Sequence, residues 1–488
     1  MTEARAILEA LREHGQLQAE PPAVPAITAV ASDSRRVTPG ALFCAIEGSA
    51  MDGHAFVADA ARRGAAATLV ARRLDDVSIP QILVRDSRVA AAAAAAAWFG
   101  YPARTLQLIG VTGTNGKSTT VALIRHVLNA AGDVGALGTL GAMDGVGGTL
   151  PDDAGLTTPG PVELQAALAA LRARGVRTVV MEASSHALHQ RRVHGLAFAG
   201  AVYTNLTHDH LDYHGDYDAY LAAKMLLSEQ LAGAGSVEVV NADDPAWGAL
   251  PTHPPARRIE FSALGAAEVH VRNLTCGPEG SSFILVCGEG RAAVVLPLVG
   301  DFNVSNALGA AAVAWGLGIP LELIAARLAA APQVPGRLER LVREPFVVLR
   351  DYAHTPDALQ RVLRAVRSMT AGRVLVLFGA GGDRDRRKRA VMGEVAAREA
   401  DLAIVTSDNP RTEDPERILD DIEAGLGGVA HVRIADRREA IARALRLVQP
   451  GDTLVLAGKG HETYQVVGTT KLPFDEAVIV REALEVAR

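Results

Sequence analysis

The chain has 488 residues, which is too long for one hydrophobic core and suggests about three domains. Hydrophobic residues make up 49% of it but aromatic residues only 4%, and this aliphatic bias with 47 glycines is typical of alternating strands and helices, so we expect an α/β fold. The formal net charge of −6 excludes a global basic field that would attract nucleic acid or an anionic membrane, so neither is expected as a partner.

The cysteines and the apolar runs indicate the compartment. Cys44, Cys276 and Cys287 are odd in number and far apart, which fits neither a disulfide framework nor a paired zinc site. Residues 1–18 have a charged amphipathic pattern rather than that of a secretory signal, and the longest apolar run, 89–99, is about half as long as a membrane span. We therefore expect a soluble cytoplasmic protein.

Residues 1–103 form the first expected domain, a smaller α/β domain. Strands are expected at 42–46, 67–71 and 81–84, and an alanine-rich helix at 87–99. Gly100-Tyr101-Pro102 interrupts the helical pattern, so a domain boundary is expected just after it.

A glycine-spaced loop follows at 110–119, between an apolar strand pattern and a helix pattern. Small residues let backbone N–H groups surround phosphate oxygens, while the following helix directs its partial positive charge at the same anion. Lys117 would reach the β- and γ-phosphates, and the Ser118 hydroxyl would bind Mg²⁺. The common phosphate loop has glycine where this chain has Val111, so this is a variant loop. The alternative is a glycine-rich turn with a chance Lys-Ser pair.

Residues 104–335 form the second expected domain, in which strands at 178–181 and 201–203 alternate with helices such as 162–174. Two of its segments, 182–186 and 204–214, are rich in groups that bind metals. Glu182 and His186 follow a strand, where a metal bound to phosphate would lie. A zinc site is the alternative, but no cysteine accompanies the histidines, and Mg²⁺ prefers oxygen ligands.

Residues 336–488 form the third expected domain, which is doubly wound and Rossmann-like. Its expected strands are 346–349, 374–378, 402–405, 432–434 and 453–456. Ligands gather at the carboxyl ends of such strands. Four polar clusters stand there, at 351–354, 381–385, 408–411 and 458–462. A solvated loop is the alternative for any single cluster.

Five motifs, taken together, resemble the Mur ligases of bacterial peptidoglycan synthesis. They are Gly-Thr-Asn-Gly-Lys-Ser-Thr at 113–119, Glu-Ala-Ser-Ser-His at 182–186, Thr-Asn-Leu-Thr-His-Asp-His-Leu-Asp-Tyr-His at 204–214, Asp-Tyr-Ala-His-Thr-Pro at 351–356 and Asp-Asn-Pro-Arg at 408–411. The resemblance runs from about Ser32 to Glu462 through all three domains. It is strongest to the members that add meso-2,6-diaminopimelate to UDP-N-acetylmuramoyl-L-alanyl-D-glutamate. It therefore implies these two substrates, with ATP and Mg²⁺ as cofactors, and a role in cell-wall biogenesis, cell shape and cell division.

The resemblance also implies where the UDP-sugar peptide binds. The N-terminal domain would hold the UDP-sugar, at positions Ser32, Ser34, Ser49, Ala50 and Met51. The muramoyl dipeptide would be held by Thr157, Thr158, Ser184, Gln190 and Arg192.

For the nucleotide, the resemblance implies binding in the central domain. The phosphates would lie against Gly113, Thr114, Asn115, Gly116, Lys117, Ser118 and Thr119, and the adenine and ribose against Asn303, Asn306, Arg337, Asp351 and His354. Mg²⁺ would be held by Ser118, Glu182, His210 and Lys224. In the family, the lysine at the position of Lys224 carries a carbamate formed with CO₂, which turns a cation into an oxygen ligand for the metal. From the sequence alone, Lys224 is an ordinary surface lysine.

The implied reaction has two steps. The D-glutamyl side-chain carboxylate attacks the γ-phosphate of ATP to give an acyl phosphate, and an amine of the incoming amino acid then displaces phosphate. Lys117, Glu182, His210 and Lys224 are the implied catalytic residues, acting by positioning and charge stabilisation. The base that acts on the amine is not identified by the sequence.

The choice of amino acid is expected to lie in the third domain. Diaminopimelate carries a carboxylate that lysine lacks, and an arginine fork can bind it bidentately. Arg411 supplies such a fork within Asp408-Asn409-Pro410-Arg411, and lysine-adding members of the family lack it. The resemblance further implies that Arg384 holds the other carboxylate, with a solvated basic helix start as its alternative. Gly458 and Glu462 would accept the ammonium group.

Two other functions compete with this interpretation. A ligase similar to folylpolyglutamate synthetase shares the ATP-ligase core but lacks the N-terminal domain and the Asp-Asn-Pro-Arg sequence. A P-loop phosphotransferase or a nucleotide switch would not need polar clusters at the strand ends of a third domain. The protein is expected to act as a monomer.

Overall fold

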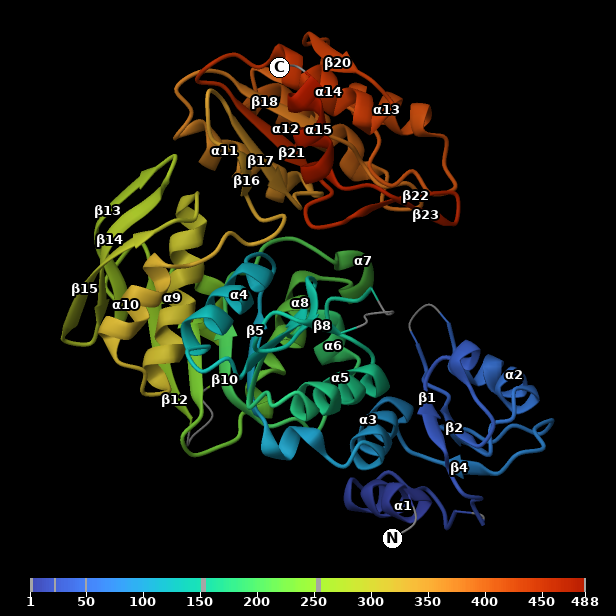
Figure 1. Cartoon of the computed structure of the whole chain (residues 1–488). Coiled ribbons are helices and arrows are strands. Elements are labelled where there is room, and N and C mark those ends of the chain that lie inside the picture. Colours follow the sequence, from blue (N-terminus) through green and yellow to red (C-terminus); the bar gives the residue numbers. More distant parts are fainter. Residues whose placement is uncertain (1–2, 22, 49–50, 151–154, 252–255, 487–488) are drawn as a thin grey trace. The chain divides into compact units, whose positions relative to one another are not determined.

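The computed structural model describes residues 3–21, 23–48, 51–150, 155–251 and 256–486 (Figure 1). By their contacts these residues fall into two compact units. The first holds the chain up to His270 together with Val286–Gly290 and Ser305–Ile324. The second holds Val271–Leu285, Arg291–Val304 and the chain from Ala325 onward.

The first unit opens with a four-stranded parallel sheet in the order β1-β2-β3-β4. Its strands are β1 Ala29–Ala31, β2 Ala41–Cys44, β3 Ala67–Val70 and β4 Gln81–Leu83, and its helices are α1 Glu3–Glu13, α2 Val57–Arg62 and α3 Ser87–Trp98. One hydrophobic cluster joins the sheet to α1 and α3, and a second joins it to α2, so both faces are covered. Three 3₁₀ turns lie at Ser34–Arg36, Gly53–Phe56 and Pro102–Thr105. The three strands and the helix expected in this part are confirmed.

Helix α3 is built almost wholly of alanine, the residue with the highest helix propensity. Asp86 caps it, because its side chain accepts hydrogen bonds from the backbone N–H groups of Arg88 and Val89. The alanines from 90 to 95 are buried. Their small side chains let α1 pack on one side of α3 and α5 on another. The alanine run is therefore the surface through which the N-terminal sheet joins the rest of the first unit.

The larger sheet of the first unit has β5 at its centre. Its order is β12-β11-β10-β5-β9-β6-β7-β8, parallel from β12 to β6, with β7 and β8 antiparallel at the edge. The strands are β5 Gln107–Thr112, β6 Val134–Gly138, β7 Gly141–Met143, β8 Thr149–Leu150, β9 Thr178–Glu182, β10 Phe198–Tyr203, β11 Val237–Asn241 and β12 Arg257–Ser262. Because β5 lies between β9 and β10, the carboxyl ends of these three strands meet, and the segments 113–116, 183–184 and 204–210 are brought together.

Helices connect the strands of this sheet up to β11, and two more come later in the chain. They are α4 Lys117–Leu128, α5 Pro161–Ala173, α6 Ser185–His189, α7 Leu211–His214, α8 Tyr217–Met225, α9 Asp301–Gly316 and α10 Leu321–Ala329, with 3₁₀ turns at Ser228–Gln230 and Pro245–Ala249. One large hydrophobic cluster lies between the sheet and helices α5 and α8. The strands and helix expected at 178–181, 201–203 and 162–174 are confirmed.

The second unit contains a six-stranded doubly wound sheet in the order β16-β17-β21-β18-β19-β20. Only β16 is antiparallel to its neighbour. The strands are β16 Glu339–Val342, β17 Val347–Asp351, β18 Val374–Phe378, β19 Leu402–Val405, β20 His431–Arg433 and β21 Thr453–Ala457. All five strands expected in this part are confirmed, and the edge strand β16 is an addition.

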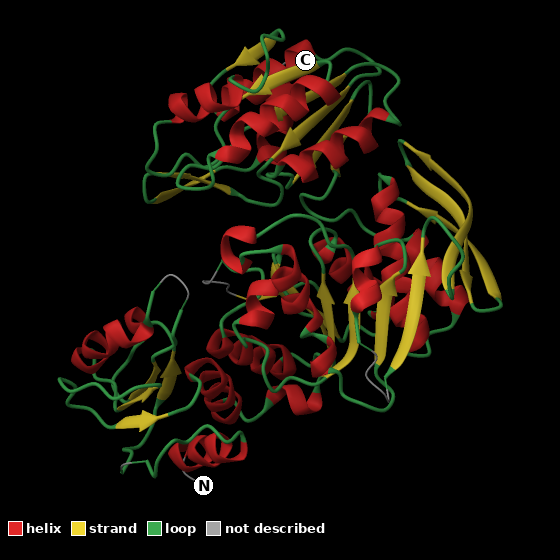
Figure 2. Cartoon of the chain, turned by 180° about the vertical axis from the view of Figure 1, so that it is seen from behind, coloured by secondary structure: helices red, strands yellow, loops and turns green. Residues whose placement is uncertain are grey.

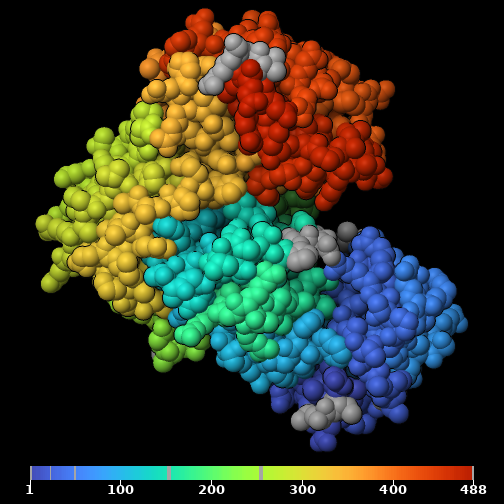
Figure 3. Space-filling model, viewed as in Figure 1, coloured from blue at the N-terminus to red at the C-terminus, as the bar shows by residue number. Residues whose placement is uncertain are grey.

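Helices cover both faces of this sheet (Figure 2). Helices α11 Pro356–Arg367, α12 Arg387–Glu399 and α13 Pro415–Glu423 pack on one face, and α14 Arg437–Leu447 and α15 Glu476–Val486 on the other. A hairpin of β22 Tyr464–Val467 and β23 Thr470–Pro473 extends from the sheet. On the face seen in Figure 3, these C-terminal residues, coloured orange to red, pack into one continuous body.

Three long strands, β13 Val269–Gly277, β14 Gly280–Cys287 and β15 Gly290–Leu296, are neighbours in the strand order. Most of their residues belong to the second unit. The sequence analysis did not predict them.

Candidate active site

The glycine-spaced loop lies between β5 and α4, as its sequence predicts. Gly113 has φ +143°, and a Cβ there would stand 1.9 Å from Thr204 Oγ1. Gly116 has φ +84°, and a Cβ there would stand 2.3 Å from Asn306 Oδ1. Both positions therefore need glycine, for conformation and for space. Thr119, one turn into α4, is buried.

A second segment braces this loop from the end of β10. Asn205 accepts a hydrogen bond from Asn115 N–H at 3.0 Å through Oδ1, and its backbone oxygen accepts one from Thr114 N–H at 2.7 Å. Thr204 Oγ1 donates to Asn115 O at 2.7 Å. Thr114 Oγ1 lies 3.0 Å from Tyr220 OH. The loop is thus held in shape by protein contacts, which is the preorganisation that phosphate binding needs.

Two lysines converge on one carbonyl oxygen of the loop. Lys117 Nζ donates to Gly113 O at 2.9 Å and to Thr114 O at 2.7 Å. Lys224 Nζ donates to the same Gly113 O at 2.7 Å and is almost completely buried. Burial, and after it the charge of Lys117, hold the pKa of Lys224 well below its ordinary value. An anion placed here would offset two cations that the structure brings together.

Glu182, at the end of β9, is buried and well bonded. Its Oε1 accepts from Ser118 Oγ and from Thr139 N–H, both at 2.8 Å, and Thr139 Oγ1 lies 3.3 Å from Oε2. The structure therefore joins two of the four predicted metal ligands. A hydroxyl and a carboxylate fit Mg²⁺, which prefers oxygen. Among the described residues, no three His, Cys, Asp or Glu side chains form a metal-binding group.

Histidines from the segments after β9 and β10 lie close to one another. His210 has φ +55° just before α7, and its ring centroid lies 4.7 Å from that of His186. Burial is the main cause that lowers the pKa of His210, and the charge of the neighbouring Asp209 partly offsets it. The pKa values of His186 and His214 fall to about 4, chiefly through burial. These rings are therefore neutral near pH 7, which is the state in which imidazole binds a metal.

The residues predicted to hold the dipeptide form one hydrogen-bonded chain. Thr158 Oγ1 donates to Glu182 O at 2.8 Å and lies 3.2 Å from Ser184 Oγ. Arg192 donates to Thr158 O at 2.8 Å and to Gln190 Oε1 at 2.7 Å. Thr157 enters the same network, because Thr139 Oγ1 donates to its Oγ1 at 3.1 Å.

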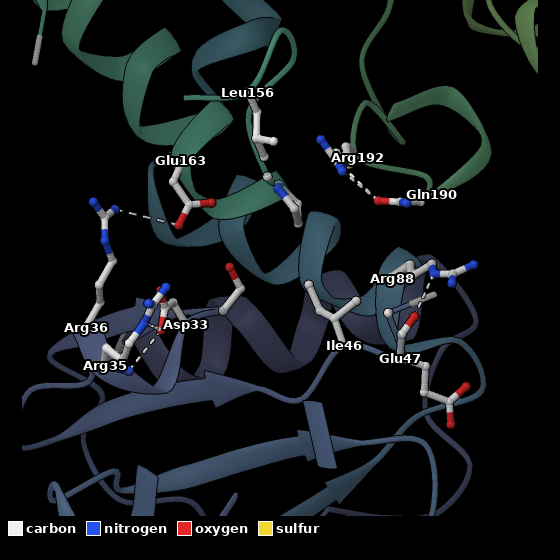
Figure 4. A pocket seen from close by; sticks show the side chains of 14 residues that line it. Asp33, Arg35, Arg36, Ile46, Glu47, Arg88, Leu156, Glu163, Gln190 and Arg192 are labelled. Carbon is white, nitrogen blue, oxygen red and sulfur yellow. Dashed lines mark hydrogen bonds and ion pairs between the residues drawn. The ribbon is translucent and has the colours of Figure 1, made fainter. Parts of the chain in front are cut away.

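A pocket of about 340 Å³ lies between the N-terminal sheet and the larger sheet of the first unit (Figure 4). Ser32 lines it from the N-terminal side, and Gln190 and Arg192 line it from the other, so members of two predicted substrate sets meet. Four arginines and three carboxylates also line it, namely Arg35, Arg36, Arg88, Arg192, Asp33, Glu47 and Glu163. The excess of arginine favours an anionic ligand.

Two of the other predicted sugar-binding positions do not line this pocket. Ser34 is buried and does not line the pocket, and Met51 is 69% exposed. Ser49 and Ala50 lie outside the described residues.

Two asparagines predicted to hold the nucleoside lie one turn apart on α9. Asn306 accepts a hydrogen bond from Thr120 Oγ1 at 3.3 Å and lies against Gly116, so the structure places it at the phosphate loop. Asn303 is buried, and its Nδ2 donates to Val299 O at 2.7 Å.

In the second unit, Arg337, Asp351 and His354 cluster around one tyrosine. The guanidinium of Arg337 lies 4.9 Å from the ring centroid of Tyr352, whose centroid is 4.7 Å from that of His354. Asp351 accepts backbone hydrogen bonds from Leu338 and Ala353 at 2.7 and 2.8 Å, and burial raises its pKa. The three predicted residues are thus brought together.

The loop 408–411 and the loop 458–462 form a second cluster in this unit. Asn409 Nδ2 donates to Glu462 Oε2 at 3.0 Å. A Cβ on Gly458 would stand 2.8 Å from Asp408 Oδ2, so these two residues touch. Pro410 stands between Asn409 and Arg411 and is buried.

Arg411 and Arg384 both lie beside Gly381. Arg411 has φ +53°, and its Nη1 donates to Gly382 O at 2.7 Å. A Cβ on Gly381 would stand 3.0 Å from Arg411 Nη1 and 3.6 Å from Arg384 Cγ. Arg384 is exposed and donates to Asp383 O at 3.1 Å.

Several residues at these sites were missed from the sequence. Thr139 and Asn205 contact the predicted residues, but Thr139 belongs to no motif. Lys459 and Tyr464 lie in the second cluster. Lys459 belongs to the polar cluster 458–462, which was recognised from the sequence. Tyr464 carries no signal of its own, because its place follows from the hairpin β22–β23.

Family models match three stretches of the chain. They are the Mur ligase family catalytic domain at residues 26–102, the Mur ligase middle domain at 111–314 and the Mur ligase glutamate ligase domain at 336–460. None of the described helices is long and apolar enough to cross a membrane.

Curated relatives match over nearly the whole chain. The UDP-N-acetylmuramoyl-L-alanyl-D-glutamate–2,6-diaminopimelate ligase of Synechococcus elongatus is 46% identical, covering 94% of each chain. The protein of the same name from Gloeobacter violaceus is 45% identical, covering 95% of this chain and 94% of the relative. A solved structure with that name is 34% identical, with a TM-score of 0.66 and 95% of each chain covered. Together with the three matched domains, these similarities show that the chain belongs to the Mur ligase family.

Proposed function

We propose that the protein is an ATP-dependent ligase that joins meso-2,6-diaminopimelate to UDP-N-acetylmuramoyl-L-alanyl-D-glutamate. The observation that carries the proposal is the 46% identity, over 94% of each chain, to a relative named for that reaction. The Asp408-Asn409-Pro410-Arg411 sequence and the pocket between the two sheets of the first unit support it. The protein would act as a monomer in the cytoplasm, where the precursors of the cell wall are made.

The sugar nucleotide would occupy the pocket of the first unit. Its diphosphate would meet the arginines that line the pocket, and its peptide would extend along Thr157, Thr158, Ser184, Gln190 and Arg192. Proposed bounds of the domains are 1–103 for the UDP-sugar, 104–335 for ATP and 336–488 for the amino acid. Ser32 supports this placement because it lines the same pocket as Gln190 and Arg192.

ATP would bind with its phosphates against the loop from Gly113 to Thr119. Lys117 would exchange its bonds to the carbonyls of Gly113 and Thr114 for phosphate oxygens. Ser118, Glu182, His210 and a carbamylated Lys224 would hold Mg²⁺, which neutralises charge on the transferring phosphoryl group. Asn303, Asn306, Arg337, Asp351 and His354 would contact the adenosine.

The chain's own residues would then work by positioning. Thr158 and Arg192 would hold the D-glutamyl side chain so that its carboxylate can attack the γ-phosphate, giving an acyl phosphate. The amino acid would lie with its carboxylates on Arg411 and Arg384 and its ammonium near Gly458 and Glu462. One of its amines would displace phosphate and form the amide.

The test is phosphate release by the purified protein with ATP and Mg²⁺. We expect release only when both the UDP-muramoyl dipeptide and meso-diaminopimelate are present. Equal turnover with L-lysine would refute the choice of amino acid, and release without the sugar nucleotide would refute the ligase. Activity on a folate substrate would favour the folylpolyglutamate-synthetase alternative. Nucleotide hydrolysis or phosphate transfer that needs no amino acid would favour a phosphotransferase or switch.

A further inference from the structure

Lys459 is a buried cation in the middle of the second cluster. It follows Gly458 at the carboxyl end of β21, and its side chain is 0% exposed. Its Nζ donates to Asn409 Oδ1 at 2.7 Å and to Glu462 Oε2 at 3.0 Å, and it lies 3.7 Å from Asp408 Oδ1. One ammonium group thus meets three side chains that are candidates for binding the amino acid.

These contacts fix the direction of two of those side chains. Glu462 Oε2 accepts from Lys459 and from Asn409 Nδ2, both at 3.0 Å, so two protein donors share one carboxylate oxygen. Asn409 Oδ1 accepts from Lys459 and from Val466 N–H, at 2.7 and 2.9 Å. A buried charge is tolerated only when it is paired and hydrogen-bonded, so this arrangement has one favourable geometry.

The charges around Lys459 are also informative. Asp408 and Glu462 contribute two carboxylates, and Lys459 contributes one ammonium at contact distance. The pair of carboxylates therefore keeps one unit of negative charge beyond what Lys459 neutralises. That remainder matches the single ammonium group at one end of an amino acid.

We propose that Lys459 is a positioning residue of the amino-acid pocket. It holds Glu462 and Asn409 in the orientation in which they meet the substrate. It also neutralises one of the two negative charges of Asp408 and Glu462, so that one negative charge is left for the ammonium group of the substrate. The proposal rests on the proposed function, because it takes this cluster as the amino-acid site.

The test compares Lys459→Met with Lys471→Met. Lys471 is a matched control: it is exposed, and its Nζ lies 4.3 Å from the ring centroid of Tyr464, which Lys459 Nζ approaches to 5.7 Å. We expect Lys459→Met to raise the KM for diaminopimelate by about tenfold or more, because Glu462 and Asn409 lose their common partner. The KM values for ATP and the sugar nucleotide should stay within about twofold. An unchanged KM for the amino acid, or an equal effect of Lys471→Met, overturns the proposal.

A double-mutant cycle shows whether Lys459 acts through Glu462. We expect the effect of Lys459→Met on the amino-acid KM to be much smaller in a Glu462→Gln background, whereas additive effects overturn the proposal. If Lys459→Met melts at a much lower temperature than the wild type, Lys459→Gln replaces it in the cycle, since the amide keeps a polar group at the buried position but removes the positive charge.

The wild-type amino-acid panel separates this proposal from the proposed function. If the wild type prefers another amino acid, the proposed substrate fails, and the cycle is run with the preferred one. The same double-mutant cycle then tests the role of Lys459: a much smaller effect in the Glu462→Gln background supports it, and additive effects overturn it. If the wild type uses no amino acid, both proposals are overturned.

Discussion

Lys224 combines nearly complete burial with a second lysine beside it. Both Nζ atoms donate to Gly113 O, and the pKa of Lys224 lies well below its ordinary value, first because of burial. A neutral amine is the form that reacts with CO₂, since the lone pair of its nitrogen is available. The environment of Lys224 therefore supports the proposed carbamate.

We predict that Lys224→Met abolishes most of the activity without lowering stability. Burial disfavours a polar amine at this position, and methionine fills a similar volume without a polar group, so the melting temperature should be equal or higher. Phosphate release should fall by about 100-fold, because a charged ligand near the phosphoryl group is lost. Calorimetry and the phosphate assay measure the two effects. A variant that keeps wild-type turnover would contradict the role of Lys224.

Arg411 offers the clearest test of substrate choice. One guanidinium nitrogen of Arg411 donates to Gly382 O, and this hydrogen bond fixes the orientation of the planar group. Arg411→Lys keeps the charge but not the fork. We expect the KM for diaminopimelate to rise by about tenfold, with the kcat changed less. Steady-state kinetics at saturating ATP measure this, with Arg387→Lys, an exposed arginine on α12, as the control. Equal KM values for Arg411→Lys and the wild type would show that a point charge suffices.

At the scale of elements, one buried arginine connects the loops after β18 and β19. Arg389 on α12 is 1% exposed and donates to both carboxylate oxygens of Glu413, at 2.9 and 3.1 Å, and to Asp421 at 2.8 Å. Glu413 also accepts the backbone N–H of Asp383 at 2.6 Å. The segments that carry Arg384 and Arg411 are therefore held to each other through Glu413.

This link predicts a pH dependence of stability. Hydrogen bonding by Arg389, the largest cause, lowers the pKa of Glu413 to about 2, below its ordinary value of 4.5. The folded state therefore binds fewer protons than the unfolded state between these values. The contribution of Glu413 is fully present above pH 4.5 and is lost as the pH falls toward 2.

We expect Glu413→Gln to have a lower melting temperature than the wild type at neutral pH. The difference between the two melting temperatures should narrow as the pH falls below about 4.5. Calorimetry across that range measures the difference. Glu482→Gln, at an exposed ion pair on α15, is the control and should have little effect at any pH. A difference that grows on acidification would contradict the assigned cause.

The sequence predicted those elements whose pattern is local. The strands of the C-terminal sheet are short apolar runs bounded by turns, and all five were found because such runs need no partner to be recognised. Strands β13 and β15 carry many exposed side chains, so their burial pattern gives a weak signal. The hairpin β22–β23 is similarly exposed. The pairing of Lys459 with Asn409, fifty positions away, depends on the strand order, which no local pattern contains.

At the scale of the whole molecule, the sites are distributed over both compact units. The pocket that contains Ser32 and Arg192 belongs to the first, and the cluster around Lys459 belongs to the second. From the sequence, the dipeptide and the amino acid were expected in different domains, and the motifs lie at strand ends of the larger sheet of the first unit or of the six-stranded sheet of the second. Prediction of the residues inside the pocket was less complete, since Arg36 and Arg88 belong to no motif.

We predict that each substrate protects its own part of the chain from hydrogen exchange. The UDP-muramoyl dipeptide alone should slow exchange in 32–48 and 156–192, because binding stabilises the segments that line the pocket. Diaminopimelate with the other substrates present should slow exchange in 408–411 and 458–467. Exchange measured by mass spectrometry resolves these segments, and α10 serves as an internal reference. Protection of 408–411 by the sugar nucleotide alone would contradict the assignment.

Gly381 lies within 4 Å of both arginines that are proposed to hold the amino acid. Any side chain there would push on Arg411 Nη1, because a single Cβ would already stand at 3.0 Å. The absence of a side chain at position 381 therefore leaves room for the Arg411 guanidinium and the Arg384 side chain beside the same residue. In the proposed site, this room would set the length of the dicarboxylic amino acid that can lie between the two arginines. Selection by length would then depend on residue 381, which itself need not touch the substrate.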